Sequence, residues 1–136
     1  PEGPATDIFR NIIKAHAGKA LFVDFWATFC GPCRGGIEHT AGLRQQYKDH
    51  PEFQFIYITS DRESPEKTYN EYVEKNLKGE ACYRIPQADY NYLRQLLRFN
   101  GIPHYEWIEK AGTVLRNSPG TDNLEKYLKQ RFGSKK

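Results

Sequence analysis

The chain has 136 residues, a length that suits one domain with a hydrophobic core of its own. Its 20 Lys and Arg against 17 Asp and Glu leave a net charge of +3, too weak and scattered to indicate nucleic-acid binding. No run approaches the roughly 18 apolar residues that a membrane-spanning helix needs. The sequence lacks methionine and any signal-peptide pattern, so we interpret it as the mature part or C-terminal domain of a longer protein.

The first third of the chain predicts a helix, a strand and a second helix. A Pro/Gly-rich lead or linker over residues 1–5 precedes a short amphipathic helix that Thr6 or Asp7 can cap. The apolar run over 20–27 predicts a buried strand. A long helix is expected over 32–49, because proline is tolerated in the first helical turn.

The rest of the chain alternates strand and helix patterns. In chain order we expect a strand over 53–59, a helix over 64–77 capped by Ser64, a short extended piece over 81–85, a helix capped by Asp89, a strand over 104–109 that turns back into a second strand over 113–116, and a last helix capped by Thr121 or Asp122. The first two strands need a helical crossover and so should be parallel, whereas the last two form a hairpin. This order predicts an α/β fold around a mixed sheet.

Two cysteines follow the first strand directly. Backbone N–H groups and the positive end of the helix favour the thiolate of Cys30, and this thiolate is the nucleophile in disulfide exchange. Cys33 lies one turn later and can resolve the mixed disulfide. We expect Cys30 to be accessible and Cys33 to be more covered. Zinc binding is the alternative, but it needs a second pair of ligands, and only Cys82 and four scattered histidines remain.

Two segments of the chain resemble thioredoxin. Residues 22–33 match it closely, down to Trp26 and its following alanine, the aromatic Phe29, and the Gly-Pro pair between the cysteines. The second match is Gly101-Ile102-Pro103, where thioredoxins carry the cis-proline that faces the cysteines. The region between the two motifs is longer than in plain thioredoxin, which is similar to the TlpA/ResA-like branch of extracytoplasmic bacterial thiol–disulfide oxidoreductases.

This resemblance implies one thioredoxin-fold domain over 1–136, its mixed sheet flanked by helices, with a helical insertion at about 62–98. It also implies an enzyme that reduces disulfides in partner proteins and is recharged by an upstream electron-donor protein. No cofactor is expected beyond the Cys30–Cys33 disulfide, and we expect a monomer in the bacterial periplasm or another extracytoplasmic setting. Cytochrome c maturation is the best-known setting of the branch. The alternatives are a non-catalytic binding module, or a disulfide oxidant or peroxidase of the same superfamily.

Asp24 lies in the middle of the first strand, where an acid is costly unless it is paired, protonated or exposed. The resemblance implies that Asp24 moves protons to and from Cys33; the alternative is an acid at a strand edge facing water. Two departures from the family matter. Tyr57 stands where thioredoxin has a lysine that pairs with this acid. Gly36 and Glu38 stand where many members of the branch carry a glutamate and a proline.

The resemblance also supplies a set of substrate-contacting residues. These are Trp26, Phe29, Gly31, Pro32, Ile102 and Pro103. Phe29 should form an apolar rim beside Cys30, and Trp26 should pack next to the disulfide. Only the resemblance makes the Ile102–Pro103 bond a cis candidate, because about 5–6% of X–Pro bonds are cis in folded proteins. Its implied use is to present the Ile102 backbone to an extended substrate strand.

Five other residues have two interpretations each. Cys82 is expected to be a small buried hydrophobe, with a second redox or mixed-disulfide site as the alternative. His39 and His104 fall near the site in sequence and are expected at the surface or in contact with substrate. Gly35 and Gly36 weaken the helix by roughly 1 kcal/mol each relative to Ala. Close packing of another segment is favoured as their cause over room for a partner protein.

Overall fold

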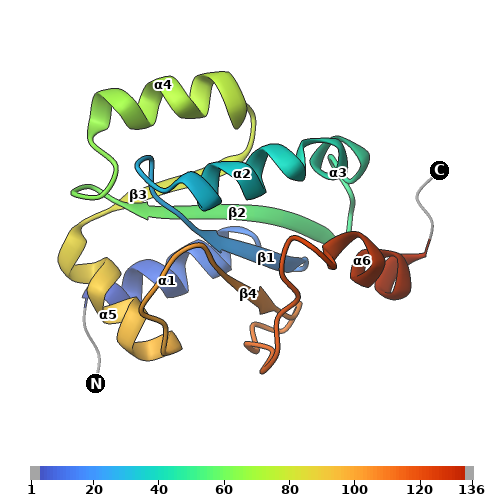
Figure 1. Ribbon diagram of the computed structural model, residues 1–136. Helices are drawn as coiled ribbons and strands as arrows, with labels where there is room; N and C mark the ends of the chain where they lie inside the picture. The colour runs from blue at the N-terminus through green and yellow to red at the C-terminus, as the bar shows by residue number, and fades with distance from the viewer. Residues whose placement is uncertain (1–3, 134–136) are drawn as a thin grey trace.

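A four-stranded mixed sheet lies between two layers of helices (Figure 1). The computed structural model describes residues 4–133, apart from the side chains of residues 4–6. The elements in chain order are α1 (Pro4–Ala15), β1 (Ala20–Phe25), α2 (Gly31–His39), α3 (Ala41–Gln46), β2 (Phe53–Ser60), α4 (Glu66–Asn76), β3 (Ala81–Ile85), α5 (Gln87–Leu97), β4 (His104–Ile108) and α6 (Leu124–Phe132). The strand order is β3-β2-β1-β4, with only β4 antiparallel to its neighbour. The predicted mixed α/β architecture is confirmed.

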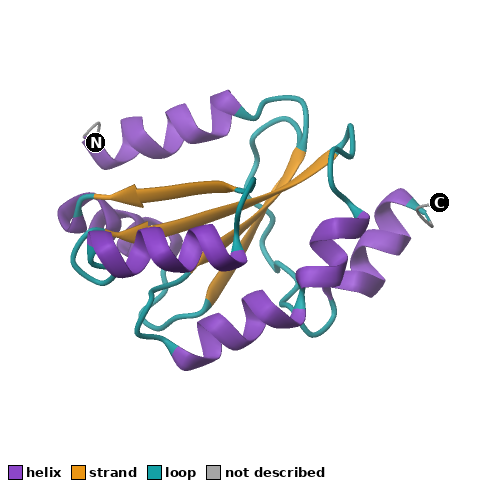
Figure 2. Ribbon diagram, turned by 90° about the horizontal axis from the view of Figure 1, so that it is seen from above, coloured by secondary structure: helices purple, strands orange, loops and turns teal. Residues whose placement is uncertain are grey.

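Successive residues of β1 point to opposite faces of the sheet. Phe22 and Trp26 pack in a cluster that also contains both site cysteines, and we call this side the cysteine face. Val23 and Phe25 pack in a second cluster on the other side, the far face. Helices α2, α3 and α4 cover the cysteine face and α1 and α5 the far face (Figure 1), and Figure 2 looks down through the first layer onto the twisted strands. Both faces of β1 are therefore covered, which fits its continuous apolar pattern.

Two of the predicted helices have different limits in the structure. Helix α1 begins at Pro4, so the lead is shorter than residues 1–5, and Thr6 and Asp7 lie inside the helix rather than at its cap. Proline at the start of a helix is favoured because its missing N–H has no intrahelical partner there. The predicted helix over 32–49 is two helices, α2 and α3, which meet at Thr40. The Thr40 hydroxyl donates to the Gly36 carbonyl at 2.9 Å, and such side-chain bonds compete with helix continuation.

The other predicted caps are also wrong. Ser64 is buried and bonds to Thr59 within 2.7 Å, so its hydroxyl ties the loop to β2 and Pro65 becomes the N-cap of α4. Asp89 lies in the first turn of α5, after an N-cap at Pro86. Helix α6 starts after Asn123, downstream of Thr121 and Asp122.

The segment over 62–98 contributes a strand as well as two helices. Its extended piece is β3, which pairs in parallel with β2 and widens the sheet. The predicted strand over 113–116 is reduced to a single bridge between Ile108 and Val114. A turn with Gly112 at φ +96° leads into this bridge. The segment then leaves the sheet, because the following Asn-Ser-Pro-Gly sequence forms strands poorly.

Candidate active site

The loop after β1 delivers the two cysteines to the start of α2. Cys30 is the N-cap of this helix, and Pro32 occupies its first turn. The two cysteines are joined by a disulfide, with their Cα atoms 5.2 Å apart. The backbone N–H of Cys33 donates a hydrogen bond to Cys30 Sγ at 3.2 Å. A free N–H at a helix N-terminus therefore already points at the sulfur that we expect to become the thiolate.

The two sulfurs differ in cover as expected, but both are nearly buried. Cys30 is 7% exposed and Cys33 is 1% exposed, so the prediction that Cys30 is accessible is wrong for this disulfide form. One side of Cys30 Sγ is closed by the Ile102 carbonyl oxygen, 3.8 Å away. The Ile102–Pro103 peptide bond is cis. Phe29, next to Cys30, is 68% exposed and gives the site an apolar rim.

Trp26 contributes to the core beneath the site. Its side chain is fully buried, and its ring lies 6.1 Å from the Tyr69 ring and 5.3 Å from the Tyr72 ring of α4. It shares the hydrophobic cluster of Cys30 and Cys33, which agrees with the expected packing beside the disulfide. Because no part of the indole is exposed, Trp26 can support the site but cannot touch a substrate.

A hollow of about 630 Å³ opens beside the cysteines. Pro32 and Pro103 line it together with His39, which agrees with a surface position for this histidine. Gly31 is exposed at the start of α2. Pro32 and Pro103 are therefore the sequence-predicted substrate residues that line this opening, whereas Trp26 is buried away from it.

The two helix glycines have different surroundings. A Cβ on Gly36 would lie 3.0 Å from the Tyr105 hydroxyl, so this glycine allows close packing of β4 against α2. A Cβ on Gly35 would have no neighbour within 4 Å. The close-packing interpretation is confirmed for Gly36 and wrong for Gly35.

Asp24 lies under the site in the middle of the sheet. Its register partners are Tyr57 on β2 and Tyr105 on β4, and it is 3% exposed, so the alternative of a strand edge facing water is wrong. Alternation along β1 places it on the cysteine face. Oδ1 has no hydrogen-bond partner among the described residues. Burial raises the pKa of Asp24 to about 8, and the positive charge of Arg44 opposes this rise. The carboxyl group can therefore hold a proton at neutral pH.

Arg44 is a buried cation that the sequence reasoning missed. It is 8% exposed, and Nη1 donates to the Ile37 carbonyl at 2.6 Å and to the Tyr57 hydroxyl at 3.5 Å. Nη2 donates to the Asn76 carbonyl at 3.2 Å. Arg44 from α3 thus brings a positive charge to the side of the sheet that holds Asp24, and its Nε pairs with Glu80 Oε2 at 3.7 Å. The seven-residue spacing from Ile37 puts Arg44 on an inward face and could have revealed it.

Cys82 and His104 take positions outside the exchange site. Cys82 is half-buried against the cysteine-face cluster, and burial raises its pKa to about 12, which fits a small packing residue. His104 stacks on Phe99 with ring centroids 4.1 Å apart and bonds to Glu106. These partners lie on the far face, and 27% of the His104 side chain is exposed, so of the two expected positions it takes the one at the surface.

Residues 4–133 contain neither a metal-ligand cluster nor a membrane-spanning helix. No group of three or more His, Cys, Asp or Glu residues in this range is placed to hold a metal ion. Within the same range, no helix has the length and apolar character needed to cross a membrane.

A disulfide at the first turn of a helix, beside a proline loop and above a mixed sheet, defines the thioredoxin-like class of folds. The chain belongs to the thioredoxin-like family, whose model matches residues 18–114.

Individual relatives agree with this assignment. The mitochondrial thioredoxin-3 of Saccharomyces cerevisiae is 41% identical over 58 residues, which are 43% of this chain and 41% of that protein. The thiol-disulfide oxidoreductase ResA of Oceanobacillus iheyensis is 22% identical over 114 residues, 82% of this chain and 56% of that protein. The chain thus spans about half the length of the curated relatives that it matches. The thioredoxin domain of a Bacteroides vulgatus thiol-disulfide oxidoreductase superposes with a TM-score of 0.75 at 19% identity, covering 87% of this chain and 82% of that one.

Proposed function

We propose that this protein is a thiol–disulfide oxidoreductase that reduces disulfides in partner proteins. The observation that carries the proposal is the Cys30–Cys33 pair at the start of α2, with a helix N–H directed at Cys30 Sγ. Membership of the thioredoxin-like family supports the same activity. The Gly-Pro pair between the cysteines favours the reducing direction, because the resemblance associates this pair with reducing members.

The exchange proceeds in two balanced steps. In the dithiol form, the Cys30 thiolate attacks one sulfur of a substrate disulfide, forms a mixed disulfide and releases the other substrate sulfur as a thiolate. Cys33 then loses its proton and attacks Cys30 Sγ, which releases the second substrate sulfur. Two electrons pass to the substrate, and the Cys30–Cys33 disulfide is formed. A donor dithiol must reduce this disulfide before another cycle.

Asp24 is proposed as the proton carrier for Cys33. When the donor opens the disulfide, Cys33 leaves as a thiolate, and the protonated carboxyl of Asp24 supplies the proton. The carboxylate can take the proton back when Cys33 attacks the mixed disulfide. Burial, which raises the pKa of Asp24 to about 8, supports this role because both protonation states are then reachable near neutral pH.

The substrate segment is proposed to lie between Phe29 and the proline loop. Phe29 would cover apolar side chains next to the reacting disulfide, and Pro32 and Pro103 would form the walls of the opening. The Ile102 carbonyl, 3.8 Å from Cys30 Sγ, is close enough to meet the backbone of a bound strand. Gly31 and the buried Trp26 are proposed to support this surface.

The setting and partners are proposals that rest on the resemblance to the TlpA/ResA-like branch. We place the protein in an extracytoplasmic bacterial compartment, as a monomer recharged by a donor protein, with the disulfide as its only redox group. Cytochrome c maturation is the first process to test. Sedimentation velocity checks the monomer, and a dimer at micromolar concentration would contradict it.

An insulin-reduction assay with dithiothreitol as the donor tests the activity. We expect wild-type protein to accelerate insulin precipitation, Cys30→Ser to abolish the acceleration, and the control Cys82→Ser to retain it. Equal rates for wild type and Cys30→Ser would favour the non-catalytic binding module instead.

A further inference from the structure

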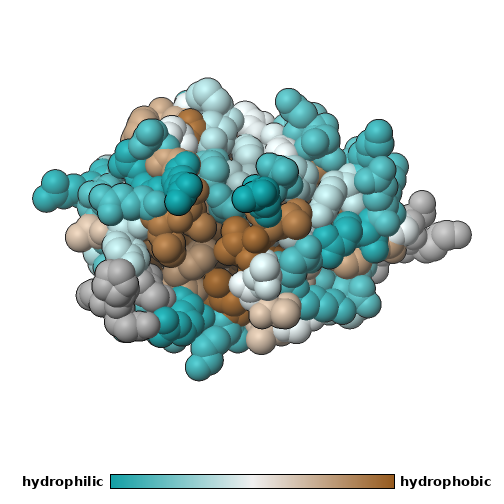
Figure 3. Space-filling view, turned by 90° about the horizontal axis from the view of Figure 1, so that it is seen from below, coloured by the Kyte–Doolittle hydropathy of each residue, from teal (hydrophilic) through white to brown (hydrophobic). Residues whose placement is uncertain are grey.

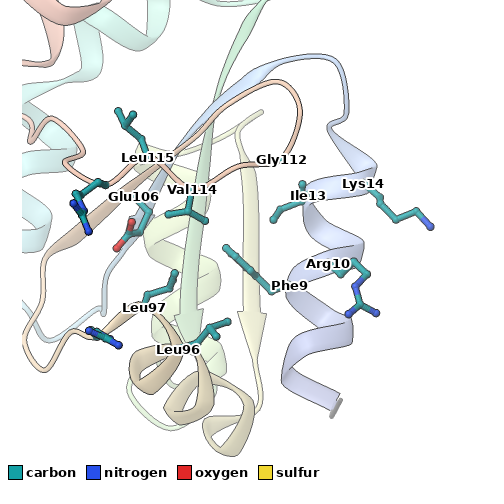
Figure 4. Close-up of a pocket in the computed structure, with 12 residues that line it drawn as sticks. Phe9, Arg10, Ile13, Lys14, Leu96, Leu97, Glu106, Gly112, Val114 and Leu115 are labelled. Carbon is teal, nitrogen blue, oxygen red and sulfur yellow. The ribbon is translucent and has the colours of Figure 1, made fainter. Parts of the chain in front are cut away.

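An apolar groove lies on the far face, between α1, α5 and the segment that follows β4. Its volume is about 670 Å³, which lies in the range of ligand-binding pockets. In Figure 4, Phe9 and Ile13 reach into it from α1, Leu97 from α5 and Val114 from above. The groove and the cysteines are on opposite sides of the sheet.

Apolar side chains of the groove are exposed to solvent instead of being packed in the core. Leu96 is 52% exposed and Val114 is 39% exposed, whereas Phe9 is buried in the groove floor. Figure 3 shows the hydrophobic surface collected in a hollow in the middle of this side, bordered by hydrophilic residues. A contiguous apolar patch with a polar border is the usual mark of an interaction site.

The border of the groove is basic. Arg10 and Lys14 project from α1. Arg98 is the C-cap of α5, and Arg116 lies two residues after the Val114 bridge. All four side chains are exposed. Arg10 pairs with Asp7 at 3.2 Å, and no ion pair joins Lys14, Arg98 or Arg116 to an acid among the described residues.

One acid faces the same space. Glu106 on β4 lines the groove, is 8% exposed and is bonded through Oε2 to His104 Nε2. The His104 ring thus occupies one oxygen of the Glu106 carboxylate. Counting Glu106 and the Asp7 that pairs with Arg10 against the four cations, the groove keeps an excess of positive charge.

We propose that the groove docks an acidic polypeptide segment with apolar side chains on one side, such as an amphipathic helix. Apolar side chains would fill the floor, and carboxylates would meet the cations at the border. Four cations spread over three elements suit a ligand with several carboxylates, whereas a fatty acid offers one. Because the groove is on the far face, a partner held there leaves the cysteines free. This inference goes beyond the proposed disulfide reduction.

Binding of designed peptides to the complete 136-residue chain tests the proposal. The probe is a fluorescein-labelled peptide with leucines at helical i, i+3, i+4, i+7 spacing and glutamates elsewhere, compared with Gln and Lys counterparts. We expect the Glu peptide to bind at least about tenfold more tightly than the Gln peptide at low salt, and the gap to shrink as salt is added. Chemical-shift changes should centre on Phe9, Ile13 and Leu97.

Surface variants locate the binding. Val114→Asp and the double change Lys14→Glu with Arg116→Glu should each weaken the Glu peptide by about tenfold or more. Lys75→Glu on α4, which covers the cysteine face, is a single charge-reversal control and should change the affinity less than about twofold. The changed side chains are exposed, so each variant should keep its fold. Circular dichroism on each variant checks this and separates lost binding from lost folding.

Four results would overturn the proposal. The Gln or Lys peptide could bind as well as the Glu peptide, or Lys75→Glu could weaken binding as much as the groove variants. Laurate could displace the Glu peptide, which would assign the groove to a single-carboxylate amphiphile. A dimer that Leu96→Asp separates would assign it to a second copy of this chain. Each of these binding results can be interpreted whether or not the protein reduces insulin, so failure of this proposal is distinguishable from failure of the proposed function.

Discussion

The two faces of the central sheet differ in how many buried polar atoms lack a hydrogen-bond partner among the described residues. The far face combines a hydrocarbon cluster, in which Leu93 and Ile58 are fully buried, with one buried carboxyl group, that of Glu106, which is bonded to His104. The Tyr90 hydroxyl is its unpartnered polar atom among the described residues. The cysteine face buries a carboxyl group and a guanidinium group, on Asp24 and Arg44. The remaining buried side-chain atoms without a hydrogen-bond partner among the described residues are Asp24 Oδ1, Trp26 Nε1, Tyr47 Oη and Tyr72 Oη.

This contrast shows where the fold accepts unfavourable burial. An unpartnered buried polar group costs about 1–3 kcal/mol, so several on one face are a considerable burden. Hydrocarbon packed on the far face offsets that burden, and two of the unpartnered residues, Asp24 and Trp26, lie on the cysteine face shortly before Cys30. Natural proteins tend to break local rules at functional sites. The contrast therefore separates residues that hold the fold from residues that carry the chemistry, and each prediction below tests that separation.

The largest effect is expected at the nucleophile. Cys30→Ser should lower insulin reduction by at least about a thousandfold, because hydroxyl cannot replace thiolate as the attacking group. Cys33→Ser should leave a mixed disulfide with insulin that gel electrophoresis without reductant detects. Residual turnover by Cys30→Ser would mean that another thiol does the chemistry.

The converse change is Leu93→Ala on the far face. Removing this fully buried side chain should lower the free energy of unfolding by about 2–5 kcal/mol, measured by urea denaturation. The specific activity per folded molecule should stay within about twofold of wild type. A large loss of activity in the folded variant would break the division between the two faces.

Asp24→Asn should separate chemistry from stability. The folded-state pKa of about 8 lies well above the ordinary aspartate pKa of 3.8, so the stability that the bound proton contributes is fully present below about pH 4. It is lost as pH rises toward 8, on the order of a few kcal/mol, since one pKa unit corresponds to about 1.4 kcal/mol. The variant does not titrate there, so its stability relative to wild type should rise across this range.

The same variant should be a poorer enzyme. We expect insulin reduction near neutral pH to fall by about a hundredfold, since a positioned proton carrier typically contributes 10²–10⁴-fold. The inflection near pH 8 should vanish from the pH–rate profile. An unchanged profile would remove Asp24 from the mechanism.

Arg44→Gln tests the buried charge. Carbonyl groups of Ile37 and Asn76 lose charged donors, so the free energy of unfolding should fall by about 1–3 kcal/mol. The pKa of Asp24 should rise, because the Arg44 charge lowers it, and the pH–rate inflection should move upward. The exposed Arg62→Gln is the control, and an inflection that moves equally in both variants would contradict a specific role for Arg44.

The smallest effects are expected at the helix glycines. Gly35→Ala should raise the free energy of unfolding by about 1 kcal/mol, because its Cβ meets open space and Ala favours helix. Gly36→Ala should lose that gain, since its Cβ would lie 3.0 Å from Tyr105 Oη. Equal stabilisation of both variants in urea denaturation would show that Tyr105 moves aside freely.

The sequence predicts the parts of this molecule that local chemistry determines. The buried run of β1, the crossover to β2 and the cysteine pair at a helix start all follow from hydrophobic pattern and spacing. The family resemblance added the cis bond before Pro103 and the proton role proposed for Asp24.

Other features depend on tertiary contacts that no local pattern encodes. Ser64 is a residue type that often caps helices, but its hydroxyl bonds to the Thr59 side chain, which the fold brings near it. Arginine is a residue type that is usually exposed, yet the guanidinium group of Arg44 donates hydrogen bonds to Ile37, Asn76 and Tyr57 inside the fold. The near-complete cover of Cys30 depends on the Ile102 carbonyl, which is 72 residues away in the chain.

The reduction potential of the Cys30–Cys33 couple tests the central claim, that this pair reduces protein disulfides. Equilibration with glutathione or a reference dithiol, followed by quantification of the two thiols, gives the value directly. We predict a potential near about −270 mV, the value of a reducing thioredoxin. A value near about −120 mV, which is typical of a strong disulfide oxidant, would contradict the account.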